Sequence, residues 1–204
     1  EVDETLVGGR TRGKGRGVTD QVRVIGAVEV KLRKVERIDT EDDARNSKRK
    51  PKRGGRYAGR LRLAVIPDKT AKICAGFIQH NVDTLTEMVV TDGSQSYAGL
   101  ARLGYQHLAC PERGEPGVSE DYLPIIHLVF SNLKTWINGT HHGVSHDHLQ
   151  AYLNEFVFRF NRRFYPFNSF RSLLGLSATK EAPTYDELYD GDWIHPNTTG
   201  RSDG

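Results

Sequence analysis

Two aspartates stand at positions where the strands of a sheet could bring their carboxylates together. Asp3 lies inside the apolar stretch "EVDETLV", and Asp92 ends the stretch "EMVVTDG" directly before Gly93. A charged side chain inside a short apolar strand is costly unless it is exposed or paired with a cation. Two close carboxylates repel each other, and a divalent cation removes this repulsion. Carboxylate oxygens favour Mg²⁺ or Mn²⁺, and two such ions about 3.5–4 Å apart can promote attack on a phosphodiester bond.

Each aspartate also has a simpler interpretation. Asp92 precedes Gly93, and Asp and Gly are both common in tight turns. Asp3 on an edge strand could simply be an exposed acid, because edge strands often carry charged side chains. The two together favour a metal site, provided that the strands carrying them are neighbours.

The pattern of apolar and turn residues predicts a mixed sheet covered by helices. Strands are expected at 1–9, 21–30, 60–66, 87–93 and 105–110, and helices at 69–81, 96–104, 124–137 and from about Ser145 onward. Hairpin-linked strands followed by alternating strands and helices indicate an α/β domain. This is the element order of a ribonuclease H-like fold with a five-stranded mixed sheet. In that fold the first and fourth strands are neighbours, so Asp3 and Asp92 would lie side by side.

Charge is distributed unevenly along the chain. A basic run between Arg45 and Arg60 includes Lys50, Lys52 and Arg53, whereas the C-terminal end is acidic. Such a run suits a polyanion, although a solvated loop is the alternative. We expect a domain over 1–174 with a basic insertion at about 31–59, followed by an acidic, largely irregular tail over 175–204.

The composition argues against a membrane protein and against a disulfide-rich one. The 204 residues contain no apolar run of the roughly 20 residues that span a bilayer, and no signal peptide. The two cysteines, Cys74 and Cys110, form no Cys-x-x-Cys pair, which fits a reducing, cytoplasmic setting. Because the chain begins at Glu1 rather than Met, we expect a segment to precede it.

Four histidines crowd the stretch "GTHHGVSHDH" and raise the alternative of a zinc hydrolase. His142 and His146 have the i, i+4 spacing of a helical zinc pair, with His141 and His148 nearby. Gly143 and Ser145 interrupt that spacing, since Ser145 resembles a helix N-cap. The two histidines would then not share a helix face, and a zinc site is disfavoured.

Three stretches of the chain resemble a known family. "EVDETLVGG", "VVTDGSQSYAGL" and "HLVFSNLKTWINGTHHGVSHDHLQAYLNEFVFRFNRR" closely resemble the catalytic domain of bacterial insertion-sequence transposases of the ISXO-two-like group, which is related to eukaryotic Merlin elements. The resemblance runs from Glu1 to about Leu174. It implies a ribonuclease H-like domain that cuts and joins DNA with an acidic triad and Mg²⁺ or Mn²⁺, with two ions bound. It places the first two triad members on Asp3 and Asp92.

The third member of the triad has two candidates. The resemblance places it on Asn132 of "SNLK", beside Lys134, and an asparagine can bind a metal through its side-chain carbonyl oxygen. Glu155 is the rival, since Glu155, Arg159 and Arg162 fall within roughly 60° of one another on a helix. That polar stripe either faces the active site or is an ordinary intrahelical Glu–Arg pair.

The expected function follows from the resemblance. A transposase catalytic domain would cleave the strand at each element end and transfer the freed 3′ end to target DNA. Its partners would be double-stranded DNA and a second copy of the chain in a homodimer, in the bacterial cytoplasm and bound to the nucleoid. The alternative is a catalytically inactive DNA-binding remnant, suggested by the asparagine in the third position. The residues expected to contact DNA are Lys134, His141, His142, Arg159, Arg162, Arg163, Lys50, Lys52 and Arg53.

Overall fold

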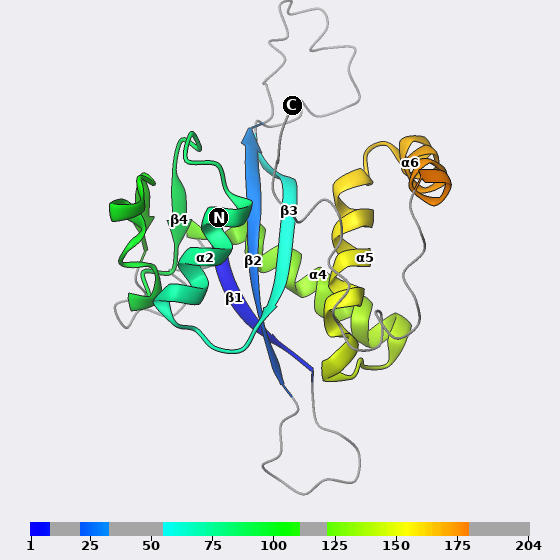
Figure 1. Cartoon of the computed structure of the whole chain (residues 1–204), viewed down its shortest axis with the longest axis horizontal. Coiled ribbons are helices and arrows are strands. Elements are labelled where there is room, and N and C mark those ends of the chain that lie inside the picture. The colour runs from blue at the N-terminus through cyan, green and yellow to red at the C-terminus, as the bar shows by residue number, and fades with distance from the viewer. Residues whose placement is uncertain (9–20, 33–54, 111–121, 180–204) are drawn as a thin grey trace, which may run out of the picture.

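The structure is a computed structural model of the whole chain, and it describes residues 1–8, 21–32, 55–110 and 122–179. Its centre is a three-stranded antiparallel sheet in the order β1-β2-β3. The strands are β1 (Val2–Val7), β2 (Val22–Leu32) and β3 (Arg56–Ile66) (Figure 1). In the register of this sheet Asp3 lies opposite Gly26, and Gly26 lies opposite Leu63.

Both faces of the sheet are buried, because side chains alternate between two cores along each strand. On β2, Val22, Val24 and Val28 belong to a core formed with the helices α4 (Pro124–His141) and α5 (Leu149–Arg162). Ile25 and Ala27 belong to a second core on the opposite face, formed with α2 (Ala71–Asn81). This arrangement explains the near-continuous apolar run of β2.

The remaining strands are β4 (Val89–Thr91) and β5 (His107–Ala109), which pair in parallel. β4 lies beside β1, as expected of the first and fourth strands. Within the described residues, however, no ladder of hydrogen bonds joins the three-stranded sheet and the β4-β5 pair into one sheet. The chain is therefore a mixed α/β domain whose strands form sheets of three and two, where a single five-stranded sheet was expected.

Two of the predicted helical segments contain 3₁₀ turns in the structure. The segment expected as a helix at 96–104 is a pair of short 3₁₀ turns, η1 (Gln95–Tyr97) and η2 (Leu100–Leu103), which ends at Gly104 with φ 89°. Ser145 does precede a helical segment, but its side chain makes no capping hydrogen bond. A 3₁₀ turn, η3 (His146–His148), leads into α5. None of the helices in the described part of the chain is long and apolar enough to cross a membrane.

Parts of the expected insertion and of the expected tail belong to strands and to a helix. β2 extends to Leu32 and β3 begins at Arg56, so both ends of the segment 31–59 belong to strands. Lys50, Lys52 and Arg53 lie outside the described residues. A further helix, α6 (Pro166–Thr179), spans the domain boundary expected at 174 and lies beyond α5 in Figure 1.

Side-chain amides of α5 cover the free edge of β3. Asn161 accepts a hydrogen bond from the backbone N–H of Leu61 at 2.7 Å and donates one to its carbonyl oxygen at 3.1 Å. Gln150 accepts from the N–H of Val65 at 2.8 Å. An edge strand presents unpaired backbone groups, and these amides satisfy them without another strand. The amides therefore fix α5 alongside β3 (Figure 1).

Replacing Asn161 by alanine should lower the free energy of unfolding by about 1–3 kcal/mol. The partly buried N–H of Leu61 loses its Asn161 acceptor, and the carbonyl oxygen of Leu61 keeps only the 3.3 Å bond from Arg62. Chemical denaturation followed by circular dichroism would measure the change. Asn138→Ala, at an exposed position on α4, is the matched control and should stay within about 0.5 kcal/mol of wild type. Equal stabilities of the two variants would contradict this role.

Candidate metal centre

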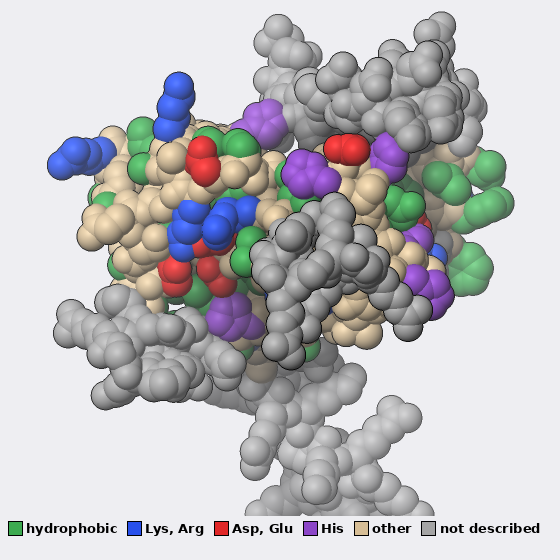
Figure 2. All heavy atoms as spheres, turned by 90° about the horizontal axis from the view of Figure 1, so that it is seen from below, with side chains coloured by type: hydrophobic (Ala, Val, Ile, Leu, Met, Phe, Trp, Pro, Cys, Tyr) green, Lys and Arg blue, Asp and Glu red, His purple; other side chains and the backbone are tan. Residues whose placement is uncertain are grey.

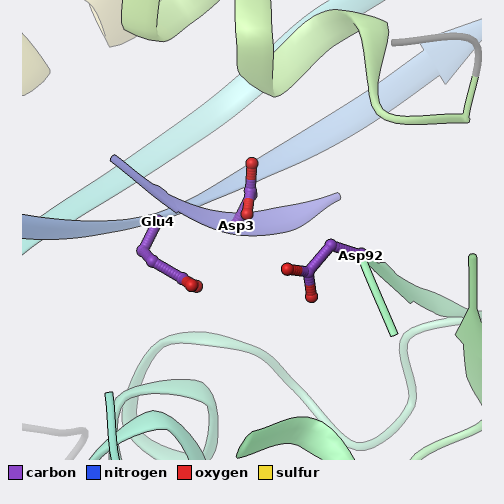
Figure 3. A group of neighbouring side chains, drawn as sticks. All are labelled: Asp3, Glu4 and Asp92. Atoms are coloured by element: carbon purple, nitrogen blue, oxygen red, sulfur yellow. The ribbon is translucent and has the colours of Figure 1, made fainter. Parts of the chain in front are cut away.

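Three carboxylates meet where β1 passes the end of β4. One oxygen each from Asp3, Glu4 and Asp92 lie within 4.8 Å of one another. Asp3 and Glu4 come from β1, and Asp92 follows β4 and extends towards them (Figure 3). The expected meeting of Asp3 with Asp92 is thus present in the structure.

Asp92 combines a turn with a place in this group. Its Oδ1 accepts a hydrogen bond from the backbone N–H of Ser94 at 2.9 Å, and Gly93 has φ 78°. These are the features of an Asp-Gly turn. Its Oδ2 accepts from Lys69 Nζ at 3.2 Å. The turn interpretation is confirmed, and the turn fixes the Asp92 carboxylate close to those of Asp3 and Glu4.

Glu4 is fixed on one face of the sheet by two partners. Lys69 forms an ion pair with Glu4, and the hydroxyl of Tyr97 donates a hydrogen bond to its carboxylate. Tyr97 is fully buried, and this burial raises the pKa of its hydroxyl well above the ordinary value, so Tyr97 remains a donor. Lys69 joins Glu4 to Asp92 because its ammonium contacts both.

Asp3 points to the other face of β1, towards α4, because neighbouring strand residues alternate. His127 Nε2 on α4 lies 3.0 Å from Asp3 Oδ2. The carboxylate of Glu1 accepts hydrogen bonds from the backbone N–H groups of Ile125 and Ile126 at 2.9 and 2.8 Å. Glu1 thus caps the first turn of α4 and fixes its position against β1. Figure 2 shows such a combination of acidic, basic and histidine side chains gathered on one face of the molecule.

The carboxyl group of Asp3 holds its proton more tightly than usual in the folded chain. Burial and the neighbouring charge of Asp92 raise the pKa of Asp3 to about 6, although His127 and Lys69 act in the opposite direction. A further cation nearby would stabilise the ionised form of such a carboxyl group. The donor set of carboxylate oxygens suits a hard divalent ion such as Mg²⁺ or Mn²⁺. The residues present therefore fit a divalent metal, although they do not identify which one.

A comparison with protein families gives a match for this chain. The sequence model described as the ISXO2-like transposase domain matches residues 1–161, which contain every side chain of this centre. The chain belongs to this family. Neither the curated proteins nor the solved structures include a match to it.

In this transposase domain Asp3 should make stability depend on pH. A carboxyl group whose pKa rises from 3.8 to about 6 on folding binds its proton more tightly in the folded state. Stability from this group is therefore present at low pH and is lost as the pH rises from about 4 to about 6. The loss is ~1–3 kcal/mol in the absence of metal. Asp3→Asn should abolish it.

Urea unfolding of wild type and Asp3→Asn in metal-free buffer from pH 4.5 to 7.5 would measure this dependence. The stability advantage of the variant should grow with pH across this window and shrink when Mg²⁺ or Mn²⁺ is added. An advantage that does not vary with pH would show that Asp3 is not held at a raised pKa.

The two candidates for the third triad member lie elsewhere. Asn132 is exposed on α4, five residues after His127 and therefore about 140° around the helix from the face that meets Asp3. Glu155 is exposed on α5 and pairs with Arg159 at 3.4 Å. Because α5 packs along β3 while the carboxylates lie at β1, the structure does not bring Glu155 to them.

The basic residues expected to contact DNA have different environments. Lys134 is exposed on α4, seven residues after His127 and on the same side of the helix. Arg159 is exposed beside Glu155, and Arg162 stacks on the ring of Phe158 at 3.9 Å. Arg163 is engaged within the domain, because its guanidinium donates hydrogen bonds to the carbonyl oxygens of Phe160 and Ala58.

Four histidines lie at the end of α4 and just beyond it, namely His141, His142, His146 and His148. They do not form a metal site with one another. His141 packs edge-on against Trp136 and Tyr152, with ring centroids 4.8 and 4.6 Å away, and its Nε2 is buried without a hydrogen-bond partner. His142 ends α4 in a left-handed conformation with φ 55°. Among the residues that the structure describes, Asp3, Glu4 and Asp92 are the one group of three or more His, Cys, Asp or Glu side chains close enough to share an ion. The zinc alternative therefore gains no support.

Four residues of the centre were not predicted from sequence, namely Glu4, Lys69, Tyr97 and His127. The sequence gives only weak signals that these residues belong to a site. Lys69 stands after a predicted strand end, and Tyr97 looks like an ordinary core aromatic residue. His127 had the clearest signal, because it interrupts the apolar stretch "PIIHLVF" and lies seven residues before Lys134 on one side of the predicted helix.

Proposed function

We propose that this transposase domain carries out metal-dependent cleavage of DNA strands and their transfer to target DNA. The meeting of Asp3 with Asp92, in a chain that belongs to the ISXO2-like family, carries this proposal. Both carboxylates lie on fixed elements, Asp3 on β1, which pairs with β2, and Asp92 in a hydrogen-bonded turn. We also propose a ribonuclease H-like arrangement in which β4 and β5 continue the sheet beyond β1.

Asp3 and Asp92 would hold the metal, which when bound supplies an activated water or 3′-hydroxyl and stabilises the leaving oxygen. The contact between His127 Nε2 and Asp3 Oδ2 fixes the orientation of the Asp3 carboxylate. Lys69 neutralises part of the negative charge on the opposite side, where it bridges Glu4 and Asp92. The metal would neutralise the negative charge of the carboxylates that Lys69 does not neutralise. The raised pKa of Asp3, due to burial and to the charge of Asp92, supports this proposal.

DNA would follow the side of α4 that carries Lys134, because that residue is exposed on the same side as His127. Arg159, Arg162 and His142 would add contacts to phosphates, whereas Arg163 would stabilise the fold. We further propose that the chain acts as a homodimer that bridges two element ends, and that it works in the bacterial cytoplasm on nucleoid DNA.

A nicking assay on supercoiled plasmid and on cognate-end duplexes tests the proposal. Cleavage should require Mg²⁺ or Mn²⁺, stop on addition of EDTA and return when the metal is restored in excess. Bound DNA without cleavage at any metal concentration would favour the inactive, DNA-binding remnant instead.

A further inference from the structure

The meeting of His127 with Asp3 depends on two features that bring α4 close to β1. Glu1 caps the first turn of the helix, and Gly26, opposite Asp3 in the sheet, leaves room for it. A Cβ atom at Gly26 would lie 2.9 Å from Phe130 and 3.0 Å from Ile126, both on α4. The sheet therefore has a gap in its side chains where the helix crosses, and His127 reaches Asp3 on that side.

The separation of the two side chains suits shared coordination of one ion. Two adjacent ligands of an octahedral ion with bonds of about 2.1 Å lie about 3 Å apart. His127 Nε2 and Asp3 Oδ2 are 3.0 Å apart. The same distance is also that of a hydrogen bond, so a metal bound by both atoms would take the place of the shared proton and keep the two residues together.

We propose that His127 is the third metal-binding side chain of this centre, and that its Nε2 and Asp3 Oδ2 bind one divalent cation together. This inference rests on the proposed function, since it completes the site that Asp3 and Asp92 begin. His127 is not in the group that lies within 4.8 Å, so it would not share an ion with Asp92. Asp3 lies between them and would contribute to two ions, which suits a pair about 3.5–4 Å apart.

The other candidates are less suitable because of their positions. Asn132 lies about 140° around α4 from His127 and is exposed. Glu4 is on the opposite face of β1, where Lys69 and Tyr97 already hold its carboxylate. Ser131 and Lys134 follow His127 on the same side of the helix, as exposed residues. They are placed to contact the DNA beside the site.

An imidazole ligand also has a consequence for the choice of metal. Mg²⁺ strongly prefers oxygen ligands, whereas the softer transition metals accept imidazole nitrogen more readily. A centre that uses His127 should therefore bind Mn²⁺ more tightly than Mg²⁺. His127→Asp should shift the preference towards Mg²⁺, because it supplies an oxygen in place of the nitrogen.

Pulsed electron paramagnetic resonance of Mn²⁺ bound to the whole chain tests this inference. Protein with ¹⁴N-histidine and protein with selectively ¹⁵N-labelled histidine should give different nitrogen modulation in the wild type. The difference should vanish in His127→Gln and persist in His146→Gln, an exposed control on η3. Mn²⁺ affinity, measured by calorimetry, should fall about 10–100-fold in His127→Gln and stay unchanged in the control.

Two outcomes separate this inference from the proposed function. Mn²⁺ that binds in a manner dependent on Asp3 and Asp92 but shows no histidine coupling would overturn the role of His127 and leave the site itself intact. Failure of the wild type to bind Mn²⁺ or Mg²⁺ at all would overturn both. A wild-type Mn²⁺ spectrum without histidine coupling overturns the role of His127 however well the His127→Gln variant folds.

Discussion

Asp92→Asn should abolish DNA strand cleavage and transfer while leaving the chain folded. Asparagine fits the same turn, because its side-chain oxygen can still accept the hydrogen bond from Ser94. It removes a full negative charge from the centre, and with it the charge that raises the pKa of Asp3. We expect the cleavage rate to fall about 10³-fold or more, equivalent to roughly 4 kcal/mol of transition-state stabilisation.

Asp83→Asn is the matched control. Asp83 accepts a hydrogen bond from the backbone N–H of Leu85 at 2.9 Å, in a turn like that of Asp92 and Ser94. It is not in the carboxylate group, so its loss should leave cleavage within about twofold of wild type. Plasmid nicking and strand-transfer assays at a saturating and a limiting concentration of Mg²⁺ would measure both variants.

The outcome that would refute the assignment is specific. Cleavage by Asp92→Asn at the wild-type rate and with the same dependence on Mg²⁺ would show that Asp92 is only a turn residue. A comparable loss of cleavage in both variants, together with a loss of stability, would show that turn geometry and not metal binding is responsible. Retained folding, monitored by circular dichroism, is therefore part of the measurement.

The sequence predicted the aspartate pair well because both positions depend on strand order. Asp3 lies inside the first strand, and Asp92 follows the fourth strand at a glycine turn. An analogy of element order was sufficient to make the two strands neighbours. Local pattern and topology agree here, so no detail of side-chain packing was needed.

His127 could not be predicted in the same way. Its contact with Asp3 joins residues far apart in the sequence, and it depends on how α4 is rotated about its own axis. Periodicity identifies the apolar face of a helix but not which neighbouring element lies at the boundary of that face. Glu1 and Gly26 fix that rotation through long-range contacts, so the contact of His127 with Asp3 follows only from the fold.

The polar stripe of α5 shows the same limit. Glu155 and Arg159 do pair on one side of the helix, as their spacing indicated. The stripe was expected to face the active site, yet α5 packs along β3 through Asn161 and Gln150. Those amides resembled ordinary polar positions in the sequence, and their role depends on an exposed strand edge that only the folded sheet presents.

Gly26→Val should destabilise the domain, because the sheet has no room for a side chain at this position. Valine would normally favour a strand, but its Cβ would lie 2.9 Å from Leu63, 2.9 Å from Phe130 and 3.0 Å from Ile126. Three packed side chains on two elements would have to move, so the substitution should cost about 1–3 kcal/mol as an overpacked core. Thermal unfolding should shift down by several degrees for a chain of this size.

Gly76→Val distinguishes this steric effect from a general effect of valine. A Cβ atom at Gly76 on α2 meets nothing within 4 Å, so valine should be neutral or slightly stabilising there, since it has the better helix propensity. Equal stability of the two variants would show that α4 does not need the gap at Gly26.

The functional consequence of Gly26→Val should exceed the loss of stability. Below its unfolding temperature, the variant would keep Asp3 and Asp92 on their strands but hold α4 further from β1, since Gly26 lies opposite Asp3. His127 would then no longer reach Asp3, and metal affinity should fall towards that of His127→Gln. Calorimetric titration with Mn²⁺ would measure this fall, and an affinity equal to that of wild type in folded Gly26→Val would contradict it. The close approach of α4 to the sheet therefore links the packing of the core directly to the chemistry of the metal centre.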